Sequence, residues 1–132
     1  MASTPAYAAT PKIGIGQIST ANTNRDGTGT IGTVFTAGSS GSRIDAIDIK
    51  ATGTTTSGMI RLFIHNGTTA YLLTEVPVIA VTPSGTLPAW EVQLNTNSMS
   101  QVLPILLPTG YSLRASTNNA ETFNVAALGG DF

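Results

Sequence analysis

The chain has 132 residues, with six Lys and Arg, seven Asp and Glu, one His and no Cys. This length suits a single domain with its own hydrophobic core. The net charge of −1 argues against nucleic-acid binding, which requires clustered Lys and Arg. No apolar tract reaches the ~18 residues of a membrane span. Without Cys, disulfides and cysteine-bound zinc are excluded, and 21 Thr, 11 Ser and 14 Gly provide most of the polarity.

The first segment, residues 1–12, has no hydrophobic periodicity and contains two prolines. We expect an extended N-terminal arm here, followed by one domain over residues 13–132. The segment has neither a basic nor an apolar region, so we do not expect it to be a secretory signal. Tyr7 and Lys12 are candidate contact residues if the arm becomes ordered on a partner.

The rest of the chain favours an all-β fold. Short apolar runs alternate with clusters of Gly, Pro, Asn and Ser, and no run has the spacing of an amphipathic helix. Nine strands are expected, at residues 13–18, 30–36, 43–51, 59–65, 69–78, 89–94, 102–107, 111–116 and 122–127. We therefore predict an antiparallel β-sandwich of eight or nine short strands with a jelly-roll-like arrangement.

The segment 22–30 is rich in Asn, Thr and Gly, and Asn24, Arg25 and Asp26 are its candidate contact residues. Its spacing resembles the opening of a calcium-binding loop. However, Asp26 is its only carboxylate, and Thr33 stands where such a loop needs a bidentate Glu. A turn between strands, without a metal ion, is the better interpretation.

Two local features set the expected register of the central strands. The alternation of apolar and polar residues loses phase midway through residues 43–50, so we expect a bulge at residues 46–47, with Ile44 and Ile49 inside and the charged residues outside. Pro77 and Pro104 remove backbone donors, which favours an edge or a bulge at each.

Asn66-Gly67 predicts a two-residue hairpin that pairs His65 with Thr68. That register gives one face with core residues and a second face that is half apolar. The first face carries Ile60, Leu62, Ile64, Tyr71 and Leu73, and the second carries Arg61, Phe63, His65, Ala70 and Leu72. A solvent-exposed face does not need apolar residues such as Phe63 and Leu72. We therefore interpret the second face as a contact surface that includes Arg61. Packing against a second sheet is the alternative for Phe63.

No catalytic arrangement is found. His65 is the only histidine and precedes a turn, and Asp45 and Asp48 lie in a neutral, solvated neighbourhood. A single histidine without cysteine cannot provide the usual ligands of a zinc site. We therefore predict a non-enzymatic protein with no catalytic, cofactor-binding or metal-binding residues.

Several strings of the chain resemble a family of small phage and prophage virion proteins. They are TANTNRDGTGT at 20–30, GSRID at 41–45, GMIRLFIHNG at 58–67, LRASTNNAETFNV at 113–125 and GGDF at 129–132. The resemblance implies a structural virion protein, such as a capsid decoration or cement protein, that is made in the host cytoplasm and lies on the capsid surface. Its partners would be the major capsid protein and further copies of itself, for which a trimer is a natural arrangement.

The alternative is a tail-fibre or receptor-binding module that recognises host surface glycans. Trp90, Tyr71 and Tyr111 would then stack on sugar rings, although strand alternation directs all three inward. If the capsid hypothesis is right, Phe63→Asp is expected to abolish particle binding and to leave a folded monomer.

Overall fold

The computed structural model describes residues 9–95 and 103–132, and within them the chain forms nine strands and no helix. The strands are β1 (Thr10–Ile18), β2 (Gly32–Thr36), β3 (Ser42–Ala51), β4 (Gly58–His65), β5 (Ala70–Val78), β6 (Glu91–Asn95), β7 (Ile105–Leu107), β8 (Ser112–Thr117) and β9 (Phe123–Asp131). Each overlaps one predicted strand. The prediction of an all-β antiparallel sandwich is thereby confirmed, and the jelly-roll-like arrangement stays a prediction.

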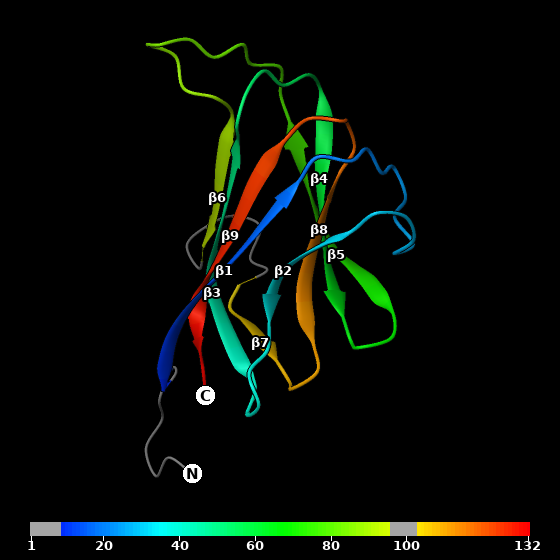
Figure 1. Cartoon of the computed structure of the whole chain (residues 1–132), viewed down its shortest axis with the longest axis vertical. Helices are drawn as coiled ribbons and strands as arrows, with labels where there is room; N and C mark the ends of the chain where they lie inside the picture. Colours follow the sequence, from blue (N-terminus) through cyan, green and yellow to red (C-terminus); the bar gives the residue numbers. More distant parts are fainter. Residues whose placement is uncertain (1–8, 96–102) are drawn as a thin grey trace.

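The strands form two packed sheets (Figure 1). The β1 sheet has the order β1-β9-β3-β6, with β7 paired to β3 as well. The β4 sheet has the order β2-β8-β4-β5. Because alternate residues of each strand point to one face, each sheet can direct an apolar row toward the other.

The hydrophobic core lies between the sheets. Its largest fully buried side chains include Phe35 at the edge of the β4 sheet, Ile47 in β3 and Leu113 in β8. Trp90 packs edge-on against Phe123, with 5.8 Å between the ring centroids and 88° between the planes. Trp90 is therefore a core residue and is not available to stack on a sugar ring.

The expected bulge in β3 is present, one residue earlier than predicted. The register of β3 against β9 shifts between Ile44 and Ala46, so Asp45 is the extra residue. This position places Ile47 inside together with Ile44 and Ile49, and all three are fully buried. The prediction omitted Ile47 from the core because it placed the bulge too late.

The boundary of the predicted N-terminal arm is wrong. β1 begins at Thr10, and Thr10, Pro11 and Lys12 pair with Asp131, Gly130 and Gly129 of β9. The Lys12 ammonium lies 3.2 Å from the Asp131 carboxylate, donates to the Thr36 carbonyl and lies over the Phe35 ring. These contacts join residues 9–12 to the sandwich. The rest of the predicted arm, with Tyr7, lies outside the described residues.

The β4–β5 hairpin also differs from its prediction. Its loop has four residues, 66–69, because the Asn66 side-chain oxygen accepts hydrogen bonds from the backbone N–H groups of Thr68 and Thr69 at 3.0 and 2.8 Å. His65 therefore pairs with Ala70 instead of Thr68. A second irregularity follows, because the register shifts again between Leu62 and Phe63.

These two shifts change which β5 residues reach the core. Val76 and Val78 are buried there, whereas Tyr71 and Leu73 are exposed, so the prediction that the last two belong to the core was wrong. The second predicted face contains the correct residues. Near the hairpin, the pairing of β4 with β5 is displaced by two positions from the predicted register, and a shift of two keeps the same β5 residues on that face. Phe63 pairs with Leu72 and His65 with Ala70, which places each pair on one face. Pro77 lies on the edge strand β5, as predicted.

Candidate functional site

The segment between β1 and β2, residues 19–31, folds back over the outer face of the β4 sheet. Its Asn22 backbone pairs with Thr117 at the end of β8, and Gly27 approaches the Ala70 carbonyl so closely that a Cβ atom there would collide with it. Gly27 also has φ +86°, a conformation that favours glycine. We call residues 19–31 the covering loop.

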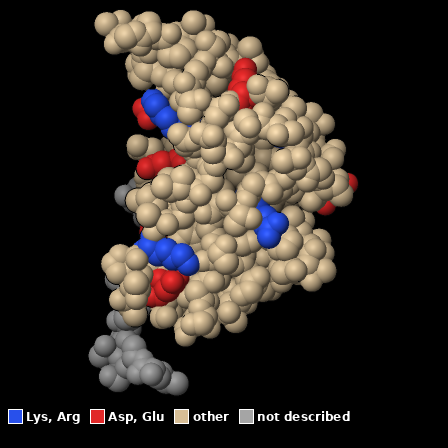
Figure 2. Space-filling model, in the orientation of Figure 1, with Lys and Arg blue, Asp and Glu red and all other residues tan. Residues whose placement is uncertain are grey.

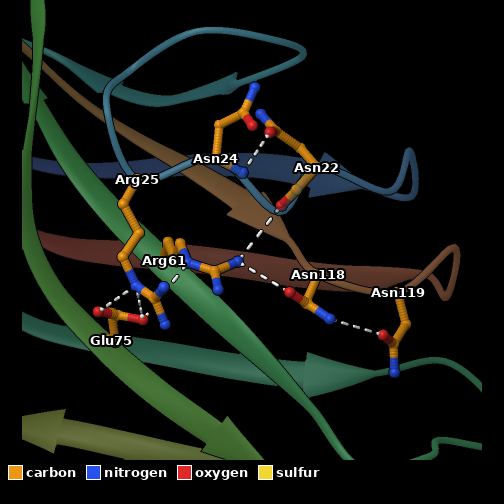
Figure 3. A network of polar contacts seen from close by, with 7 residues as sticks. All are labelled: Asn22, Asn24, Arg25, Arg61, Glu75, Asn118 and Asn119. Carbon is orange, nitrogen blue, oxygen red and sulfur yellow. Dashed lines mark hydrogen bonds and ion pairs between the residues drawn. The ribbon is translucent and has the colours of Figure 1, made fainter.

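A buried arginine holds the covering loop to the sheet (Figure 3). Arg61 in β4 is only 3% exposed. Its Nη1 donates to the Asn22 carbonyl at 3.3 Å and to the Asn118 side chain at 3.1 Å, and its Nε lies 3.4 Å from Glu75 in β5. Since a buried guanidinium needs charge compensation and acceptors, these contacts fix where the loop can lie.

Glu75 links this arginine to a second one on the covering loop. The Arg25 Nε donates to both carboxylate oxygens of Glu75, at 2.9 and 3.0 Å. The hydrogen bond from Arg25 is the main cause that holds the pKa of Glu75 below its usual range, and the charge of Arg61 adds to the effect. Burial opposes the shift by raising the pKa. Glu75 is therefore the common anion of two arginines.

The Glu75 carboxylate gives a testable pH dependence. Because its pKa is lower in the folded protein than in the unfolded chain, it stabilises the fold above the ordinary carboxyl pKa, and this stabilisation is lost as the pH falls through the folded value. We expect the melting temperature to fall as the pH is lowered below the ordinary carboxyl pKa. Asp131 and Asp26 shift in the same direction, so the wild type must be compared with Arg25→Gln.

In Arg25→Gln the main cause of the Glu75 shift is removed, so the fall in melting temperature should be smaller than in the wild type. The measurement is a series of thermal melts followed by circular dichroism. Identical pH profiles for the two proteins would contradict this assignment.

The covering loop is also joined internally. Asn22 Nδ2 donates to the carbonyls of Thr28 and Thr30, both at 3.0 Å, and Asn22 Oδ1 accepts from the Asn24 backbone at 3.0 Å. The Asp26 carboxylate accepts from the N–H and the hydroxyl of Thr28, which lowers the pKa of Asp26. The side-chain oxygens of Asn22 and Asp26, two of the residues that resemble calcium ligands, thus accept hydrogen bonds within the loop. Within residues 9–95 and 103–132, no three His, Asp or Glu side chains gather as a metal site would require.

A small polar pocket lies between the covering loop and the tip of the β4–β5 hairpin. Its volume is about 310 Å³, and its lining includes Asp26, Thr28, His65, Thr68 and Arg114. The Arg114 Nε donates to the Ser112 hydroxyl at 3.1 Å, and His65 Nδ1 accepts from the Gly67 N–H at 3.1 Å. The pocket therefore combines a cation, a carboxylate and hydroxyl groups in one concave site.

The structure brings only part of the predicted contact set together. Asn24, Arg25 and Asp26 are exposed on the covering loop, and Leu72 is half-buried on the same side of the β4 sheet. Lys12 is joined to Asp131 on the β1 sheet, away from this group.

The prediction that Arg61 and Phe63 form an exposed contact surface is wrong. They are 3% and 0% exposed, because the chain itself covers their face. Phe63 is also outside the core cluster between the sheets, so a second sheet is not what buries it. The covering loop contacts this face at Arg61 and at Ala70, so it supplies part of the cover that the half-apolar pattern indicates.

Sequence reasoning missed Glu75, Asn118 and Arg114. The predicted hairpin register placed Leu72 opposite Arg61, whereas the structure places Glu75 there. A buried strand position occupied by Arg is itself a signal for a nearby carboxylate, since an unpaired buried cation is strongly unfavourable. That signal identifies Glu75 as a candidate only once the register is known.

Comparison with models of known protein families found no match, and neither did a search of curated proteins. In the part of the chain that the structure describes, no helix has the length and apolar character to cross a bilayer.

Proposed function

We propose that this protein is a structural component of a phage virion, a decoration or cement protein that binds the major capsid protein and stabilises the shell. On this proposal it lies on the capsid surface after synthesis in the host cytoplasm, as a homo-oligomer without enzymatic activity, and binds neither nucleic acid nor a membrane. The sequence strings that resemble small virion proteins support it.

The preorganised covering loop carries the proposal. Although it contains no strand, the loop is held by its own side chains, by the buried Arg61 and by the Arg25–Glu75 ion pair. Rigid presentation of Asn24, Arg25 and Asp26 lowers the entropy that ordering would otherwise cost on binding. A protein that must bind many equivalent sites on a shell benefits from such a surface.

The surface charge agrees with this role. Only 10% of the residues are charged, and the face shown in Figure 2 is mostly uncharged, with few acidic and basic groups. A low net charge favours association over repulsion when many copies lie close together. Specific contacts on such a surface must come from shape and hydrogen bonds more than from long-range attraction.

The test is co-sedimentation of the purified protein with phage heads that lack it. We expect saturable binding at a fixed ratio to the major capsid protein. Arg25→Glu, which places a carboxylate against Glu75 and releases the loop, should weaken binding by about tenfold or more. The matched control is Lys50→Glu, which breaks an exposed ion pair with Glu91 on the β1 sheet and should bind like the wild type.

Because Arg25 is exposed, we expect Arg25→Glu to fold. A thermal melt checks this before binding is measured. Failure of the wild type to bind heads would reject the capsid proposal. Wild-type affinity of Arg25→Glu would reject the covering loop as the contact surface.

The polar pocket favours a second candidate function, recognition of host surface glycans by a receptor-binding module. Arg114, Asp26 and the threonine hydroxyls can hydrogen-bond sugar hydroxyls and carboxylates. The aromatic residues first considered for stacking do not line this pocket: Trp90 is in the core, Tyr111 packs against it and Tyr71 is exposed elsewhere. A glycan array without hits would reject this candidate.

A further inference from the structure

The edge of the β1 sheet formed by β1 has an unusual combination of length and regularity. β1 pairs with β9 over nine residues, Thr10 to Ile18, without a register shift. It is the end strand of its sheet, and within the described residues no other strand pairs with its second edge. A strand in this position presents a row of N–H and C=O groups that another strand can pair with.

The other edge strands of the described chain carry the features that prevent such pairing. β2 has five residues and a register shift, and β6 and β7 have five and three residues. β5 is as long as β1 but contains Pro77, Glu75 and a register shift against β4. Short length, proline, charge and bulges all disfavour edge pairing, so β1 is the exception.

β1 itself has little protection. Pro11 lies near its beginning, and its one charged residue, Lys12, turns toward Asp131 and the Thr36 carbonyl. Gly14 and Gly16 face β2, where a Cβ on Gly16 would lie 2.6 Å from the Thr33 carbonyl oxygen. Residues 13–18 therefore offer an edge without charge, proline or bulge.

The outer face beside this edge is apolar. Ile13 and Ile15 are 55% and 66% exposed, and Leu128, the partner of Ile13 on β9, is 38% exposed. A shallow groove lined by Pro11, Lys12, Ile13, Leu128 and Gly129 runs along the same strands. Apolar side chains next to an open strand edge are typical of a covered surface.

We propose that a second copy of this chain pairs with β1, antiparallel and across a two-fold axis, so that two β1 sheets become one continuous sheet. A two-fold interface places the same surface on both copies, so a surface with charge of one sign would repel itself. Lys12 is the only charged residue of β1, and Asp131 compensates its charge. In the two-fold pair, Lys12 of one copy lies opposite residues 16–18 of the other copy, which are uncharged. In any register centred on Gly14 or Ile15, the isoleucines of the two copies lie together.

This two-fold pair differs from the trimer expected from capsid symmetry. It does not depend on the capsid proposal, because mass in solution and head binding are measured separately.

Multi-angle light scattering should give twice the 13.5 kDa mass of the chain at high concentration. Ile15→Lys brings two ammonium groups to the axis and should raise the dissociation constant at least about tenfold. The control is Ile79→Lys, which changes an equally exposed isoleucine outside β1 and should leave the mass unchanged.

Hydrogen exchange distinguishes edge pairing from stacking of the apolar faces. In the two-fold pair, alternate amides of β1 on the open edge should exchange more slowly as the protein concentration rises. A monomer at all concentrations, a trimer insensitive to Ile15→Lys, or an oligomer without this protection would each overturn the proposal. Protection of β1 only on phage heads would also overturn it, because the strand's partner would then be the capsid protein.

Discussion

Arg61→Ala should lower the free energy of unfolding by about 3 kcal/mol, because it removes a buried cation on which three separate groups depend. The Asn22 carbonyl and the Asn118 side chain lose their donor, and Glu75 loses one of its two arginines. Urea unfolding followed by the fluorescence of Trp90, the single and buried tryptophan, measures the change. A loss below about 1 kcal/mol would contradict the assigned role.

Two further variants separate charge from packing at this position. Lys50→Ala removes a cation from an exposed ion pair with Glu91 and should cost less than about 1 kcal/mol. Arg61→Met restores most of the buried volume but not the hydrogen bonds, so its stability should lie between those of Arg61→Ala and the wild type. Wild-type stability of Arg61→Met would show that Arg61 acts through packing alone.

Trypsin gives an independent readout on the covering loop. Arg25 is the only cleavage site within residues 19–31, and the loop is held by Arg61. Cleavage after Arg25 should therefore be faster in Arg61→Ala than in Lys50→Ala under native conditions. Equal rates would mean that the loop is held without Arg61.

The strands could be predicted because their signals are local. Alternating apolar residues between turn-forming residues define a strand without reference to the rest of the fold, and a bulge in β3 follows from the loss of that alternation within residues 43–50. The bulge was displaced by one residue because the backbone pairing with β9 decides which residue is extra.

The candidate site could not be predicted because it depends on register and on a distant loop. Asn66 forms a four-residue loop through its side chain, and a second shift near Phe63 follows, so Glu75 instead of Leu72 lies opposite Arg61. An apolar strand face indicates burial equally well whether the cover is a partner, a sheet or a loop. The sequence therefore indicates which face is covered, but not that the chain itself covers it.

Phe63 tests this distinction directly. The structure buries it completely beneath its own chain, next to Arg114 in β8 and Leu72 in β5. Phe63→Ala should therefore cost about 3–5 kcal/mol, the range for an aromatic side chain lost from a closed site. Phe63→Asp adds a buried carboxylate and should prevent folding, in contrast to the folded monomer that an exposed Phe63 would leave.

Phe63→Leu is the matched variant, because it keeps an apolar side chain of similar length and should cost only about 1–2 kcal/mol. Urea unfolding measures Phe63→Leu and Phe63→Ala, and circular dichroism reports whether Phe63→Asp folds at all. A folded Phe63→Asp with wild-type stability would mean that the covering loop leaves this face open in solution. Phe63 would then be a contact residue, and the proposed contact surface would extend from Arg25 across β4 to Leu72.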